Sequence, residues 1–124
     1  MSADVDNIAK QFADHFYSTF DTASVGLEPL YREASMLTWD GSPSLGSVEI
    51  MKVLPAAFKG GVTHQVDAID AQPASQNAAA ILVQVTGSFT NAGTARKFTE
   101  AFQLLPDGSS YYIHNHIRRT AEAS

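Results

Sequence analysis

The residues best suited to binding chemistry include a single tryptophan with an acidic neighbour. Trp39 is the only tryptophan among 124 residues, and Asp40 follows it directly. An indole ring is either buried in a core or forms a pocket wall that stacks against an incoming aromatic ring. A carboxylate is costly to bury without a partner. We therefore expect the indole to face inward and Asp40 to lie at a rim.

A second group of polar side chains lies near the end of the chain. His114 and His116 are two residues apart, which places them on one side of a strand. That spacing can hold a metal ion, but a site needs a third ligand, and His15 and His64 show no ligand pattern. We therefore predict no metal and no cofactor, and histidines that are exposed or lightly buried.

Two arginines accompany these histidines. Arg118 falls on the same side of its strand, and Arg96 belongs to a neighbouring predicted strand. Two guanidinium groups at a pocket mouth would favour an anionic guest or pair with Asp40 or Glu100. The alternative is that both are solvated arginines at strand ends.

The composition sets the broad class of protein. With 44% hydrophobic and 17% charged residues, the chain can form one core, and we expect a single domain over residues 1–124. No apolar run approaches the roughly 20 residues of a membrane span, so no membrane insertion is expected.

The net charge of −5 and eight scattered basic residues argue against nucleic-acid binding and favour a basic protein partner. The acidic start has no features of a signal peptide, which predicts the cytosol or nucleus.

Helical segments come first. Spacings of three and four residues form one apolar stripe, typical of a helix with Asp4 as its N-cap; the stripe comprises Val5, Ile8, Phe12, Phe16 and Phe20. Three phenylalanines on one stripe need a large cover, which the concave face of a sheet would supply. A second helix is expected from its cap, Ser47, to Leu54, before Pro55.

Strands dominate the remainder of the chain. Residues 35–39 alternate weakly, and the glycines and proline of 41–46 indicate a loop. Further strands are predicted at 62–68, 79–89, 96–105 and 111–119. Tight turns are predicted at Asn91-Ala92-Gly93 and Pro106-Asp107-Gly108. Residues 120–124 are expected to be frayed.

Together these elements predict an α+β domain whose helices pack in a strongly bent antiparallel sheet. Such a sheet forms a half-open cone with a cavity at its mouth. Both sheet faces carry apolar residues, because Phe98, Phe102 and Leu104 share one side of their strand while Ile113 and Ile117 share one side of the next. Only one face can cover the helix, which predicts a homodimer with Ile113 and Ile117 in its interface.

Several strings of residues resemble a known family. They are Phe20-Asp21-Thr22, Leu30-Tyr31-Arg32, Ser35-Met36-Leu37-Thr38-Trp39, Asp70-Ala71-Gln72-Pro73-Ala74-Ser75 and Leu105-Pro106-Asp107-Gly108-Ser109-Ser110-Tyr111-Tyr112. In this order and spacing they resemble nuclear transport factor 2, especially its fungal forms, within the conical NTF2-like superfamily. The resemblance runs in register from about Val5 to Arg119.

The resemblance implies a conical α+β fold, a homodimer formed sheet against sheet, and a carrier that is not an enzyme. Such a carrier binds the small GTPase Ran in its GDP form and the FG repeats of nucleoporins, and takes Ran into the nucleus. It implies a location in cytoplasm and nucleus, concentrated at the nuclear envelope. In the family, an aromatic side chain of Ran enters the cone, and acidic residues at the rim pair with Ran lysines.

Carried over residue by residue, the resemblance assigns five positions. Trp39 matches the pocket tryptophan, Asp40 stands where the family has a rim glutamate, and Val62 matches an aliphatic pocket position. Ile117 matches a hydrophobic position of the dimer interface. Val5 stands where an aromatic residue helps to hold FG repeats.

This chain also departs from the family pattern. The hairpin 90–94 contains no acid where the family has a loop rich in aspartate and glutamate. Arg96 and Arg118 fall where the Ran pocket usually has apolar residues, and His116 replaces an aspartate. The resemblance therefore implies an intact scaffold with altered binding positions.

Two alternatives to a Ran carrier remain open. The same superfamily includes ketosteroid-isomerase-like enzymes, whose catalytic aspartate lies roughly where Asp40 falls. Tyr17 could donate a hydrogen bond to an oxyanion there, but no second donor is evident. The other alternative is a dimeric interaction module that has lost Ran binding.

Overall fold

One long helix and one bent sheet make up most of the structure. The computed structural model describes residues 3–76 and 79–121. The helical elements are α1 (Ala3–Ala23), a 3-10 helix η1 (Ser24–Leu30) and α2 (Ser47–Val53). The strands are β1 (Tyr31–Trp39), β2 (Ser42–Leu45), β3 (Thr63–Pro73), β4 (Ile81–Asn91), β5 (Thr94–Asp107) and β6 (Ser110–Ala121). None of the helices in the described residues is long and apolar enough to cross a membrane.

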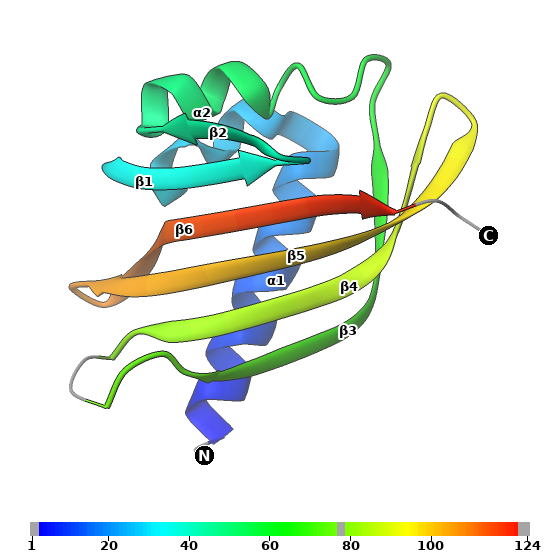
Figure 1. Ribbon diagram of the computed structural model, residues 1–124. Helices are drawn as coiled ribbons and strands as arrows, with labels where there is room; N and C mark the ends of the chain where they lie inside the picture. The colour runs from blue at the N-terminus through cyan, green and yellow to red at the C-terminus, as the bar shows by residue number, and fades with distance from the viewer. Residues whose placement is uncertain (1–2, 77–78, 122–124) are drawn as a thin grey trace.

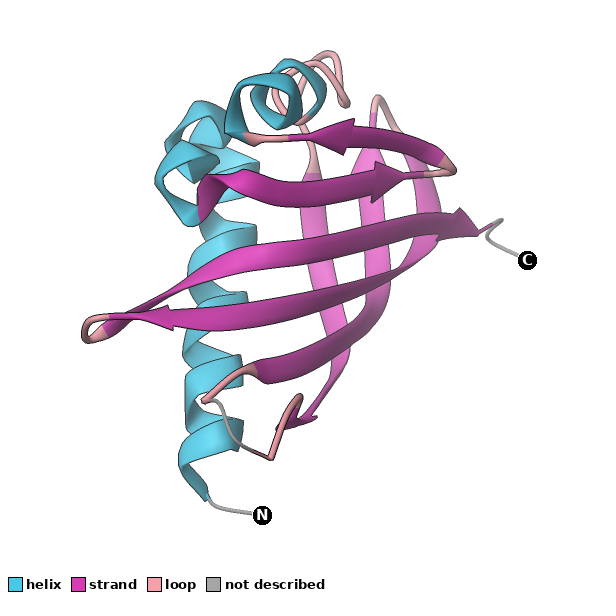
Figure 2. Cartoon of the chain, turned by 60° about the vertical axis from the view of Figure 1, so that its left-hand side comes forward, coloured by secondary structure: helices cyan, strands magenta, loops and turns pink. Residues whose placement is uncertain are grey.

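All six strands belong to one open sheet of order β2-β1-β6-β5-β4-β3. Neighbouring strands are antiparallel except β1 and β6, which run parallel. The long strands curve around α1, while η1 and α2 lie at the end occupied by β1 and β2 (Figure 1). A view from the side shows the sheet bent but not closed (Figure 2). The predicted conical α+β fold is confirmed, with one parallel pair that the sequence did not indicate.

Packing between α1 and the sheet explains the aromatic stripe. Phe16 is fully buried, and its ring centroid lies 5.0 Å from that of Phe102 on β5. Phe12 meets the same ring edge-on at 4.9 Å, and Phe20 is also buried. Each fully buried aromatic ring contributes about 1.5–3 kcal/mol by removing apolar surface from water. The predicted cover for the helix is therefore the concave face of the sheet.

The segment after β1 is a hairpin, not the predicted loop. Asp40 and Gly41 have φ of 48° and 91°, the left-handed pair that a two-residue hairpin turn requires. Pro43 lies in β2, which is an edge strand, where a missing N–H is tolerated. Gly41 and Pro43, which indicated a loop, thus belong to a hairpin turn and to a short edge strand.

Both predicted N-caps are wrong. Ser47 is the first residue of α2, and the cap position belongs to Gly46, whose φ is 89°. Gly46 provides no side-chain cap. Asp4 lies inside α1, in its first turn, where the helix dipole still favours its negative charge.

A β-bulge in β6 changes which side chains face inward. Gln103 of β5 is opposite Asn115, whereas the next residue, Leu104, is opposite Ile113, so His114 is an extra residue. Ile113 is consequently fully buried, while Ile117 is 56% exposed on the other face. The expectation that the two isoleucines share one face is wrong. The extra residue also interrupts the regular alternation of side chains in β6. The prediction that His114 and His116 lie on one side of the strand depended on that alternation.

Gly87 lies at a close approach between β4 and β3 within the bent sheet. A Cβ atom at this position would run into the carbonyl oxygen of Gln65 on β3, beside an irregularity in the β3–β4 register between Val66 and Ala68. We expect Gly87→Ala to lower the free energy of unfolding by about 1–3 kcal/mol, as overpacking does. Thr90→Ala, at an exposed position of the same strand, is the control. Equal denaturation midpoints in urea for the two variants would contradict this account of the bend.

Candidate functional site

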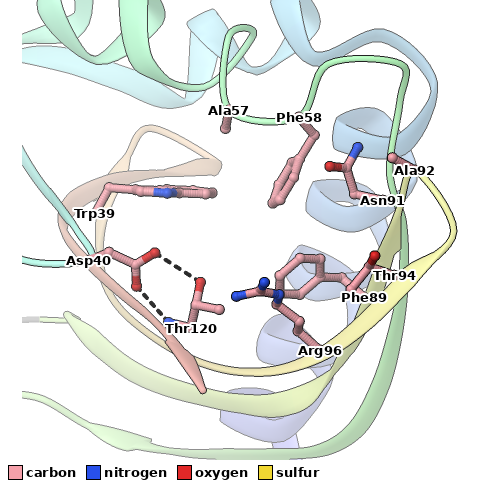
Figure 3. Close-up of a pocket in the computed structure, with 10 residues that line it drawn as sticks. All are labelled: Trp39, Asp40, Ala57, Phe58, Phe89, Asn91, Ala92, Thr94, Arg96 and Thr120. Carbon is pink, nitrogen blue, oxygen red and sulfur yellow. Dashed lines mark hydrogen bonds between the residues drawn. The ribbon is translucent and has the colours of Figure 1, made fainter. Parts of the chain in front are cut away.

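A pocket opens where four segments meet at one end of the cone. It has a cavity volume of about 360 Å³. The segments are the end of β1, the stretch between α2 and β3, the β4–β5 hairpin and the end of β6 (Figure 3). Its lining residues are Trp39, Asp40, Ala57, Phe58, Phe89, Asn91, Ala92, Thr94, Arg96 and Thr120.

Three aromatic rings form the walls of this pocket. The ring of Phe58 lies between the other two, 5.8 Å from Trp39 and 5.1 Å from Phe89 between centroids. Figure 3 shows the rings arranged around the hollow. Trp39 thus takes the predicted place of a wall that could stack against an aromatic guest.

Asp40 lies at the rim, as expected, but its carboxylate is already engaged. It accepts a 2.6 Å hydrogen bond from the backbone N–H of Thr120 and a 2.9 Å bond from the hydroxyl of the same residue. Thr120 and Ala121 belong to β6, so the expectation of a frayed end is wrong for these two residues, and residues 122–124 lie outside the described residues. This contact ties the end of β6 to the β1–β2 turn.

The other predicted pocket residues are distributed differently. Arg96 is exposed and lines the pocket. Val62 is not among its lining residues; it lines a smaller neighbouring cavity of about 140 Å³ with Phe20 and Leu54. Val5 is half-buried on α1, against the core.

Arg118 differs most from its expected place. It is completely buried, not a solvated arginine at a strand end. Its guanidinium carbon lies 4.7, 5.3 and 4.9 Å from the ring centroids of Trp39, Phe58 and Phe89. A fourth ring, Phe98, is 4.4 Å away. Arg118 therefore lies behind the pocket walls, as a cation enclosed by aromatic faces.

A buried carboxylate compensates the charge of Arg118. The Nη1 group of Arg118 lies 3.3 Å from Glu100 Oε1 and donates a 2.8 Å bond to His64 Nε2. One of the expected pairings of Arg118, that with Glu100, is thus confirmed. The Nε and Nη2 atoms of Arg118 are buried without a hydrogen-bond partner among the described residues.

Glu100 is the centre of a wider network. It accepts a 2.7 Å bond from the Tyr17 hydroxyl and a 2.6 Å bond from His116 Nε2. His116 in turn lies 3.0 Å from the Tyr31 hydroxyl through Nδ1. His116 is 1% exposed, which corrects the expectation of exposed or lightly buried histidines.

The network keeps Glu100 ionised. Burial alone would raise the pKa of this carboxyl, but the charge of Arg118 and the contacts with His116 and Tyr17 outweigh it and lower the pKa. Burial, together with the adjacent Glu100 carboxylate, raises the pKa of Tyr17, which therefore stays protonated and acts as a donor.

His64 has a defined protonation state. Its Nδ1 group lies 2.6 Å from Asp21 Oδ1, while Nε2 accepts from Arg118, so the proton is on Nδ1. Burial and the charge of Arg118 lower the pKa of His64 below its ordinary 6.5. Asp21 and Glu100 act in the opposite direction, but they do not outweigh these effects.

This arrangement suits stacking better than proton transfer. The side chains of Glu100 and His116 have no exposed surface, and neither residue lines the pocket. The Tyr17 hydroxyl is directed to Glu100 instead of the cavity, and both oxygens of Asp40 are bound to Thr120. The residues proposed for an isomerase-like site are therefore not assembled. Among the described residues no group of three or more potential metal ligands occurs.

Some residues of the site were not anticipated from the sequence. Phe58 and Phe89 were not singled out as pocket walls, nor Tyr17 and His64 as members of a buried network. The alternation of β5 did contain a usable signal, because Phe98 and Phe102 face inward and Glu100 lies between them at the same spacing.

An open sheet bent around one long helix, with an aromatic pocket at its mouth, defines the class of NTF2-like α+β domains. The model of the nuclear transport factor 2 (NTF2) domain matches residues 8–120. The Nuclear transport factor 2 of Davidiella tassiana is 41% identical over 119 residues, covering 94% of each chain. The chain therefore belongs to the nuclear transport factor 2 family, a family of transport factors and not of enzymes.

Solved structures agree with this assignment. Nuclear transport factor 2 from Cryptosporidium parvum superposes with a TM-score of 0.89 at 32% identity, covering 98% of both chains. The yeast UBP3-associated protein BRE5 superposes with a TM-score of 0.87 at 28% identity, covering 96% of this chain and 98% of that one.

The state of His64 predicts a pH-dependent stability. Its pKa is lower in the folded chain than in the unfolded one, so below pH 6.5 the unfolded chain binds a proton that the folded chain does not. We expect the free energy of unfolding to fall between pH 7 and 5.5, with a slope of up to about 1.4 kcal/mol per pH unit from this residue.

His64→Gln is the matching variant, because its amide oxygen can accept from Arg118 and it does not titrate. It should be less stable at pH 7 but show a flatter pH dependence. Urea denaturation at one fixed protein concentration measures both curves. Parallel curves would show that His64 does not titrate in this range.

Proposed function

We propose that the chain is a nuclear import carrier that binds Ran in its GDP form and FG-repeat nucleoporins. The observation that supports this most directly is the aromatic-walled pocket of about 360 Å³ in a chain of this family. An aromatic side chain of Ran would enter between Trp39, Phe58 and Phe89. Such a carrier would be found in cytoplasm and nucleus, concentrated at the nuclear envelope.

Binding of Ran-GDP should be weak in this chain. The hairpin at the rim contains no acid, and Asp40 already holds Thr120. Each missing, partly desolvated ion pair with a lysine of the partner costs on the order of 1 kcal/mol, so two reduce affinity by roughly tenfold to a hundredfold.

Acids placed at the rim should restore binding. Ala92 and Thr94 line the pocket at the hairpin, and the φ of 52° at Ala92 is one that aspartate tolerates. Ala92→Asp with Thr94→Asp should tighten Ran-GDP binding and steepen its salt dependence. Asn91 is unsuitable, because its side-chain amide donates to the carbonyls of Lys59 and Gly61.

Titration of Ran-GDP and Ran-GTP by calorimetry at two salt concentrations is the test. Ala92→Ser with Thr94→Ser is the control, because it places small polar side chains at the same positions without adding charge. Ran-GDP affinity that is equal in the aspartate and serine variants would show that rim charge does not limit binding.

A second copy of the chain is the proposed cover for the outer sheet face. Ile117 and Leu82 are exposed there by 56% and 41%, beside a hollow of about 430 Å³ that also includes Ala101 and Pro73. Ile113 is not part of this proposed interface, because its side chain is fully buried within one chain. The homodimer proposed here therefore rests on Ile117 and its outer-face neighbours.

Ile117→Glu should give monomers in sedimentation equilibrium at micromolar concentration, because it places a charge in the proposed interface. Leu45→Glu is the control, since Leu45 is 62% exposed but lies on the edge strand β2. A monomeric parent chain, or equal dissociation of both variants, would refute the proposed interface.

FG-repeat binding is proposed along α1 near this dimer seam. Val5 is half-buried there and offers a shallow apolar surface. A valine buries less area than a tryptophan, so each contact is weaker by about 1 kcal/mol, and a dimer doubles the number of contacts.

Val5→Trp should increase retention on a column of immobilised FG repeats, and Val5→Asp should abolish it. The exposed position Asn7→Asp on the same helix is the control for added charge. Identical retention of both Val5 variants and the parent would place any FG site elsewhere.

The alternative is a dimeric interaction module without Ran binding. The acid-free hairpin and the occupied Asp40 favour it. It predicts a stable dimer with no measurable affinity for either nucleotide form of Ran, and no gain from the aspartate variant.

A further inference from the structure

The three aromatic rings that form the pocket walls come from three separate segments of the chain, and all three contact Arg118. Trp39 ends β1, Phe58 lies between α2 and β3, and Phe89 is near the end of β4. Phe58 contacts each of the other two rings, and all three rings contact the guanidinium of Arg118, which lies within 5.3 Å of their centroids. Arg118 is fully buried, so it contacts the rings from the side opposite the cavity.

The guanidinium is held in place from the interior. Glu100 and His64 both contact its Nη1 group, at 3.3 and 2.8 Å. These partners are fixed in turn, because Tyr17 donates to Glu100 and Asp21 binds His64 through both carboxylate oxygens. The Nη1 end of Arg118 is thus held by β3 and β5, whose contacting residues are bound by α1, and the two nitrogens that lack hydrogen bonds belong to a guanidinium surrounded by aromatic rings.

Three aromatic rings around a hollow are normally a suitable site for a cation. Here the chain's own cation already occupies the inner faces of these rings. A cationic guest would find these faces already in use, whereas an uncharged ring can still stack against the walls from the cavity.

We propose that Arg118 is the positioning and specificity-determining residue of the pocket. Its guanidinium holds Trp39, Phe58 and Phe89 apart for an uncharged aromatic guest, and it occupies the ring faces that a cationic guest would need. The identity of the guest rests on the proposed function. The arrangement of the walls is a property of the free protein and can be tested without Ran.

Trp39 provides the measurement, since it is the only tryptophan of the chain. Acrylamide quenching reports how accessible the indole is in the free protein. Titrations with N-acetylphenylalaninamide and with tetramethylammonium report binding of an uncharged aromatic probe and of a cation. The parent chain should respond to the first probe and not to the second.

Two variants separate the effect of the planar guanidinium group of Arg118 from the effect of its charge. Arg118→Lys keeps a charge but cannot contact Glu100, His64 and the rings together, so the indole should become more accessible. Glu100→Gln with Arg118→Met removes both charges and leaves a neutral partner for Tyr17, which protects the fold. Affinity for N-acetylphenylalaninamide should fall about tenfold in either variant, which lies within the range of cation–π energies.

Arg119→Met is the control, because Arg119 is the exposed neighbour on the opposite side of the strand. It should behave like the parent in every measurement, and circular dichroism should show that all variants are folded. Unchanged quenching and probe affinity in the folded Glu100→Gln, Arg118→Met variant would overturn the positioning role. Binding of tetramethylammonium by the parent chain would overturn the specificity role. Loss of Ran binding alone would contradict only the proposed function.

Discussion

One buried carboxylate connects the parts of this molecule. Glu100 on β5 contacts Tyr17 on α1 and both His116 and Arg118 on β6, so a single side chain joins the central helix to the sheet. A charge removed from water is tolerated only when it is closely paired, and loss of one partner leaves the other uncompensated. The contacts that stabilise the core therefore also determine where Arg118 lies, and with it the walls of the pocket.

Three of the departures from the family pattern, namely His116, Arg118 and the acid-free hairpin, fall into two spatial groups. His116 and Arg118 replace an aspartate and an apolar residue in the resemblance, and the structure brings both onto Glu100. They act as one unit, since a buried guanidinium needs a counter-charge. The acid-free hairpin lies at the surface, where it changes charge without changing the fold. The interior group affects the shape of the pocket. The surface group affects the charge that the rim of the pocket presents to a partner.

Much of the fold followed from periodicity, because buried phenylalanines every three or four residues and alternating strands are local signals. The bulge at His114 was not predictable in this way, since an extra residue depends on pairing with Gln103 in another strand. That single residue moved Ile113 into the core and changed the expected dimer face. In the site, Trp39 and Asp40 were found by their types, whereas Phe58 and Phe89 required the three-dimensional arrangement, because they are distant in sequence from Trp39.

The parallel pairing of β1 with β6 has a consequence for synthesis of the chain. Tyr31 is opposite Ile113, and Trp39 is opposite Arg118, so one edge of β1 is paired by the last strand of the sheet, while β2 pairs the other edge. Contacts between residues so far apart in sequence form late and slow folding. Until β6 emerges from the ribosome, β1 has one open edge, and the pocket lacks both Thr120 in its lining and Arg118 behind Trp39. A nascent chain that stalls before β6 would expose that edge to other chains, and this is the stage at which a chaperone would be most needed.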